Sequence, residues 1–102
     1  MTSEATVADA LAALEARGYT ERLEAVDGGL RAAQWTAPRP PAELALDDAI
    51  RVEYDTDPAD EVLVLAIRDP DTGARGTYVV AYGPAADPRD AAIVEALARP
   101  TA

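Results

Sequence analysis

Apolar residues recur at helical spacing near both ends of the chain. Within 6–17 they lie on one face of a helix, because they recur every three or four positions, at Val7, Ala10, Leu11 and Leu14. Gly18 follows directly and is the residue expected just past a helix C-terminus. A second helix is predicted over 88–98, because Asp87 can cap its N-terminus and Pro88 suits its first position.

The middle of the chain carries strand patterns instead. Residues 50–55 alternate between apolar and charged side chains, which is the period of a half-buried strand. The run 62–67 is apolar throughout, as is typical of a central strand, and 77–82 is rich in Val and Tyr. The turns between these runs are too short for a parallel crossover. The sequence therefore predicts an antiparallel meander of three strands, near 49–55, 62–69 and 75–82.

A hairpin is predicted before this meander, over residues 21–35. Asp27-Gly28-Gly29 is a strong turn signal, and apolar residues flank it on both sides. Prolines within 37–41 mark a connector, because proline lacks a backbone donor, and one helical turn over 42–46 is expected to follow. We therefore expect a single α+β domain, 1–102, with two layers. Its antiparallel sheet combines the three-stranded meander with the N-terminal hairpin, and two helices cover one face of that sheet.

Composition removes much of the usual catalytic chemistry. The chain has no Cys, His or Lys, so it cannot form a thiolate or imidazole nucleophile, a structural zinc site or a Schiff base. The formal net charge of −10 disfavours binding to nucleic acid or to an anionic membrane surface. No apolar run approaches the ~20 residues of a membrane span, and the first residues do not resemble a secretory signal. We therefore expect a cytoplasmic protein with no catalytic residue and no cofactor, nucleic-acid or membrane partner.

Acidic residues crowd into 47–61, where the only basic residue is Arg51. The candidate ligand-binding residues are Arg51, Glu53, Asp57 and Asp60, and the candidate metal ligands are Asp55, Asp57, Asp60 and Glu61. A calcium loop of the EF-hand type alternates its oxygen ligands and then needs a glycine, but Ala59 interrupts the alternation here and no glycine follows. A solvated turn is therefore favoured over a metal site. An exposed ion pair is likewise favoured for Arg51 over a ligand anion.

Several short motifs occur together along the chain: Arg51-Val52-Glu53, Asp57-Pro58-Ala59-Asp60-Glu61, Gly76-Thr77-Tyr78-Val79, Tyr82-Gly83 and Ala86-Asp87-Pro88. In this combination the chain resembles a family of uncharacterised bacterial proteins of similar length. The resemblance implies a compact α+β fold and, for any site that the family shares, the residues Arg51, Glu53, Asp57 and Asp60. The chain departs from the pattern at Val52, Tyr54 and Leu65, where an aromatic residue, a glycine and a tyrosine are usual.

Some relatives in that family carry the label phosphoribosylpyrophosphate synthetase. A phosphate loop of that kind needs adjacent acids and a compact glycine-rich turn before a helix, so that backbone N–H groups can hold phosphate. Here Pro70 separates Asp69 from Asp71, and a strand is predicted to follow. We therefore do not transfer that activity to this chain.

Two classes of function remain. The preferred one is a non-catalytic module that binds a protein partner or forms a homodimer, because helices on one sheet face would leave the other apolar face of 62–67 exposed. The alternative is a small-ligand or divalent-metal-binding protein, possibly an enzyme, that uses Arg51 and the acidic loop 53–61. An acidic mimic of DNA is less favoured, because the acids crowd together instead of spreading along a face.

Overall fold

The computed structural model describes residues 6–52, 62–81 and 87–97. Their elements follow in chain order: α1 (Val7–Ala16), β1 (Glu21–Val26), β2 (Gly29–Ala32), the 3₁₀ turn η1 (Pro41–Glu43), β3 (Ala45–Val52), β4 (Val62–Arg68), β5 (Arg75–Ala81) and α2 (Pro88–Ala96). The predicted α+β class is confirmed. The predicted helical turn is shorter than expected, because β3 already begins at Ala45.

Both helices begin at a side-chain cap, and the cap of α2 is the Asp87 expected from the sequence. The Thr6 hydroxyl accepts a hydrogen bond from the backbone N–H of Asp9, at 3.0 Å, and the Asp87 carboxylate accepts one from Arg89, at 2.8 Å. Gly18 ends α1 with a φ of +99°, which a side chain would disfavour. Neither helix is long and apolar enough to cross a membrane within the described ranges.

The sheet has the strand order β2-β1-β5-β4-β3 and is mixed. The pairs β1–β2, β3–β4 and β4–β5 are antiparallel, whereas β1 pairs with β5 in parallel, through Glu21 with Gly76 and Arg22 with Thr77. The expectation of a wholly antiparallel sheet was therefore wrong. The β1–β2 hairpin is attached to the rest of the sheet through β5. Gly76 permits this close approach, because a Cβ at that position would lie only 2.8 Å from the Glu21 carbonyl oxygen, which is too close.

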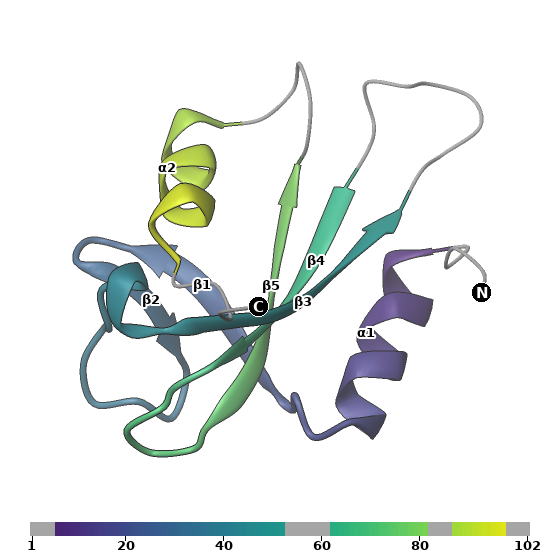
Figure 1. The fold of residues 1–102 in the computed structure, drawn as a ribbon, viewed down its shortest axis with the longest axis horizontal. Coiled ribbons are helices and arrows are strands. Elements are labelled where there is room, and N and C mark those ends of the chain that lie inside the picture. The colour runs from purple at the N-terminus through teal and green to yellow at the C-terminus, as the bar shows by residue number, and fades with distance from the viewer. Residues whose placement is uncertain (1–5, 53–61, 82–86, 98–102) are drawn as a thin grey trace.

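The two helices cover opposite faces of the sheet (Figure 1). Alternate residues of β4 point to opposite sides: Val64 and Ala66 share a buried cluster with α1, while Leu65 and Ile67 share one with α2. The prediction of both helices on one face was therefore wrong. The run 62–67 is apolar on both faces because each face has its own helical cover.

This arrangement removes the reason for expecting an exposed apolar sheet face. Among the described residues, Val79 is the large apolar side chain that lies exposed, at 41%. The α2 side is the larger cluster and also buries Leu23, Leu30 and Leu44 from the hairpin and the η1 region. The core of a single chain is thus closed on both sides of β4.

Candidate functional site

A groove of about 410 Å³ lies where three segments distant in sequence meet. The start of β1, the segment that follows β2 and the turn between β4 and β5 form its walls. We call it the Trp35 groove, and its principal lining residues are Glu21, Gln34, Trp35, Thr36, Arg39 and Asp69. Gln34 and Thr36 are exposed, so the groove opens to solvent along the segment after β2.

Arg39 is held in the groove by a backbone bridge to β2. The N–H of Leu30 donates to the Arg39 carbonyl oxygen at 3.0 Å, and the N–H of Arg39 donates back to Leu30 at 2.9 Å. Gly29 makes this approach possible, because a Cβ at that position would lie 2.1 Å from the Arg39 carbonyl oxygen. The φ of Gly29, +134°, also belongs to the region that favours glycine. The hairpin glycine therefore positions the arginine of the groove.

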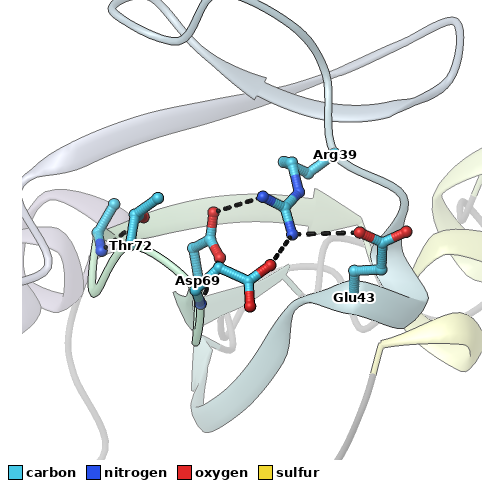
Figure 2. A network of polar contacts seen from close by, with 6 residues as sticks. Arg39, Glu43, Asp69 and Thr72 are labelled. Carbon is cyan, nitrogen blue, oxygen red and sulfur yellow. Dashed lines mark hydrogen bonds and ion pairs between the residues drawn. The ribbon is translucent and has the colours of Figure 1, made fainter.

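The Arg39 guanidinium binds three carboxylates (Figure 2). Its Nη1 lies 3.2 Å from Asp69, and its Nη2 lies 2.8 Å from Asp71 and 3.1 Å from Glu43. Asp69 is only 4% exposed, and its other oxygen accepts the backbone N–H of Asp71. The hydrogen bond to Asp71, with the charge of Asp69 beside it, raises the pKa of Arg39. This network makes one wall of the groove rigid.

The turn between β4 and β5 completes that wall. The N–H of Gly73 donates to the Asp69 carbonyl oxygen at 2.7 Å, and the N–H of Asp69 donates to Ala74 at 2.8 Å. Gly73 has a φ of +78°, which is the left-handed conformation that a glycine in a tight turn readily adopts. The Thr72 hydroxyl accepts a hydrogen bond from the N–H of Ala74. The turn therefore holds Asp69 beneath Arg39.

The other wall of the groove carries polar groups that have no partner among the described residues. The Glu21 carboxylate, the Gln34 amide and the Thr36 hydroxyl make no hydrogen bond or ion pair with any described residue. Trp35 lines the same groove, half-buried, with its side chain packed against the α2-side core. The groove thus pairs a fixed wall with a wall whose polar atoms are available to a ligand.

A second polar cluster lies on the α1 face and uses two of the acids that the sequence places in the crowded 47–61 segment. A β-bulge between Leu46 and Asp48 inserts Asp47 into β3. Asp47 accepts hydrogen bonds from the Tyr19 hydroxyl at 2.8 Å and from Arg68 at 3.1 and 3.2 Å. Asp48 pairs with Arg17 at 2.9 Å.

The charges of this cluster are matched within the chain. Burial acts to raise the pKa of Asp47, but hydrogen bonds from Arg68 and Tyr19 outweigh burial and lower it below its ordinary value. Burial, together with the hydrogen bond to Asp47, raises the pKa of Tyr19. The guanidinium groups of Arg17 and Arg75 each lie 5.7 Å from the centre of the Tyr19 ring. We therefore interpret this cluster as structural.

The candidate site predicted from the sequence falls largely outside the described residues. Arg51 lies exposed on β3, opposite Leu63 of β4. The other candidates lie in the segment 53–61, which the structure does not describe: Glu53, Asp55, Asp57, Asp60 and Glu61. A site formed by these residues together with Arg51 therefore stays a prediction. Within residues 6–52, 62–81 and 87–97, no group of three or more acids is arranged to hold a metal ion.

Local sequence patterns do not predict the groove. Glu21, Arg39 and Asp69 are separated by long stretches of chain, so their meeting depends on the pairing of β1 with β5 and on the bridge from Arg39 to Leu30. The one local signal was Trp35, a single tryptophan beside a polar Gln-Trp-Thr segment. A tryptophan in a polar loop is typical of a binding surface.

Comparisons with protein-family models, with curated proteins and with solved structures found no match. The chemistry of the groove is therefore the basis for assigning a function.

Proposed function

We propose that this chain is a non-catalytic module that binds a protein partner through the Trp35 groove. The observation that carries the proposal is the contrast between its two walls. Arg39 and Asp69 are locked in a network, while Glu21, Gln34 and Thr36 have no partner among the described residues. Such a surface offers directional polar contacts beside a fixed tryptophan, which is a residue type enriched among the hot spots of protein interfaces.

The openness of the groove favours a protein over an enclosed small molecule. Sites for small molecules bury most of the ligand surface. Here Gln34, Thr36 and Ala37 are exposed, so a ligand in the groove keeps one side in solvent. A segment of a partner protein fits this shape, because the rest of the partner covers the open side. The Arg39 network also keeps the groove formed before binding, which lowers the ordering cost of association.

Catalysis is a weaker interpretation of the same residues. General acid–base chemistry needs a group that can exchange a proton with a bound substrate. Asp69 is already engaged by Arg39 and by the backbone N–H of Asp71. Glu21 is then left as the sole lining carboxylate without a protein partner among the described residues. One half-buried carboxylate at the mouth of an open groove suits recognition better than turnover.

A different protein is a better partner than a second copy of this chain. Two copies would each bring a formal charge of −10 to the contact. In addition, α1 and α2 already cover the two faces of β4, so homodimer formation is not needed to bury them. The alternative of a ligand site formed by Arg51 and the segment 53–61 stays a prediction.

Photo-crosslinking tests the protein-binding function directly. A benzophenone amino acid replaces Gln34 at the groove, and a matched control replaces Ala12, which is exposed on α1 on the other sheet face. After irradiation in a lysate of the encoding organism, we expect a discrete protein adduct from position 34 that is absent from position 12. Excess unlabelled chain should suppress the adduct, and excess Trp35→Ala variant should not. Equal adducts at both positions, or none at position 34, would refute the proposal.

A further inference from the structure

Negative charge dominates the Trp35 groove and its rim. Among the described residues, the charged side chains that line the groove or contact Arg39 or Trp35 are four carboxylates and two guanidinium groups: Glu21, Glu43, Asp69, Asp71, Arg31 and Arg39. Their formal charges leave an excess of two negative charges. An anion would have to displace three carboxylates from Arg39, whereas a cation meets the Glu21 carboxylate, which has no partner among the described residues. The groove therefore favours a cationic group.

Trp35 adds a second preference. The face of an indole ring attracts cations more strongly than any other aromatic side chain does. The Trp35 ring is half-buried and packs on the core, so its orientation is fixed before binding. A guanidinium is planar, so it can stack on such a ring and present two parallel N–H groups to one carboxylate. A lysine ammonium is more strongly hydrated and lacks the flat face.

We infer that the Trp35 groove accepts an arginine side chain of the partner, stacked on Trp35 and paired with Glu21. This inference rests on the proposed protein-binding function and specifies the residue that the partner contributes. The chain contains a similar combination internally, where the Arg17 guanidinium lies 5.7 Å from the centre of the Tyr19 ring and pairs with Asp48. At the groove the aromatic ring and the carboxylate are present, and the arginine comes from outside.

Capped tripeptides test the inference, and Trp35 is the reporter because it is the only tryptophan of the chain. The probes are acetyl-Gly-Arg-Gly-amide and its citrulline counterpart, which has nearly the same shape without the charge. Both are titrated at neutral pH while the indole N–H signal of Trp35 is followed by NMR. We expect saturable shifts with the arginine peptide and about tenfold weaker binding of the citrulline peptide, because charge–ring attraction and the ion pair are both lost.

Two variants with the same charge change separate local from general electrostatics. Glu21→Gln should bind the arginine and citrulline peptides almost equally. Glu24→Gln removes a carboxylate from the opposite face of β1 and should leave the arginine preference unchanged. The inference fails if the wild-type chain binds the two peptides equally, or if Glu24→Gln acts like Glu21→Gln. The wild-type comparison decides the matter even if a variant does not fold.

The outcomes also distinguish the inference from the proposed function. A specific protein adduct at position 34 with no preference for the arginine peptide would overturn the inference and leave the protein-binding function in place. Arginine-selective binding lost in Glu21→Gln would support the inference, and an adduct whose formation the arginine peptide suppresses would support it further.

Discussion

Tyr78 of β5 donates a hydrogen bond from its hydroxyl to the carboxylate of Asp90, on the first turn of α2. Tyr78 is 4% exposed and belongs to the apolar cluster between the sheet and α2. The contact ties the C-terminal helix to the central part of the sheet at a defined position. Apolar contacts alone are not directional, so this hydrogen bond also helps to fix the rotation of α2 about its own axis.

Removing the hydroxyl should therefore loosen α2. We expect Tyr78→Phe to lower the free energy of unfolding by about 1–2 kcal/mol, because it leaves the half-buried Asp90 carboxylate without this donor. Urea denaturation followed by circular dichroism measures the change. Asp90→Asn keeps an acceptor at the same place and should lose less. A Tyr78→Phe variant as stable as the wild type would mean that water replaces the hydroxyl at no cost.

Two buried phenols should make the fold sensitive to alkali. Burial and the hydrogen bond to Asp90 raise the pKa of Tyr78, and burial with the hydrogen bond to Asp47 raises that of Tyr19. In the unfolded chain both phenols lose their protons near pH ~10. Unfolding above that pH therefore releases protons, so the stability supplied by these groups is fully present below it and declines as the pH rises.

The expected decline is about 1.4 kcal/mol per pH unit for each tyrosine between its unfolded and folded pKa values. Urea denaturation at a series of pH values from neutral to alkaline gives the slope. Tyr78→Phe should make the slope shallower by the contribution of one tyrosine, about 1.4 kcal/mol per pH unit. An unchanged slope in this variant would assign the alkaline sensitivity to other groups.

Gly73 and Gly29, both with a positive φ, should respond differently to alanine. At Gly73 nothing lies within 4 Å of an added Cβ, so Gly73→Ala meets only the backbone penalty of a φ of +78°, about 1–2 kcal/mol. At Gly29 the Cβ would lie 2.1 Å from the Arg39 carbonyl oxygen. We expect Gly29→Ala to lose clearly more stability and also to shift the Trp35 fluorescence. Equal losses in the two variants would show that the bridge from Arg39 to β2 adapts easily.

Arg39 should matter more for stability than an ordinary surface arginine does. Arg39→Met leaves the buried Asp69 carboxylate without its guanidinium partner. Arg31→Met, the control, removes an exposed arginine that contacts only the Trp35 carbonyl oxygen among the described residues. We expect the first variant to melt at a lower temperature than the second in calorimetry. Adding Asp69→Asn to Arg39→Met should restore part of the loss. If it restores nothing, the wall is not held by this charge pair.

Local signals were sufficient for most elements of this fold, although β3 begins at Ala45 and not near 49 as predicted. Thr6 and Asp87 cap the helices as their types predict, and Gly73 adopts the positive φ that its turn requires. The apolar run of β4 was correctly interpreted as a central strand. Each of these features depends on residues close together in sequence, where spacing and propensity act directly.

The assembly of the elements was beyond local signals. An apolar run shows that both faces of β4 are buried but not which helix covers each face, so α1 and α2 were placed on the same side. The parallel pairing of β1 with β5 depends on Gly76, which has no side chain to mark it as a contact. The groove could not be predicted for the same reason, because Arg39 and Asp71 pair there although they are 32 positions apart in sequence. No periodicity connects such residues before the strands are ordered.

The bulge at Asp47 has a consequence for how copies of this protein behave when crowded. β3 is an edge strand, and free edges invite pairing with another chain and growth into aggregates. The bulge breaks the regular ladder there, and Asp48 and Arg51 add charge along the strand. At the opposite edge, the backbone of Leu30 on β2 already pairs with Arg39. A foreign strand would have to fit around a bulge at one edge or displace Arg39 at the other, so the fold resists edge-to-edge polymerisation.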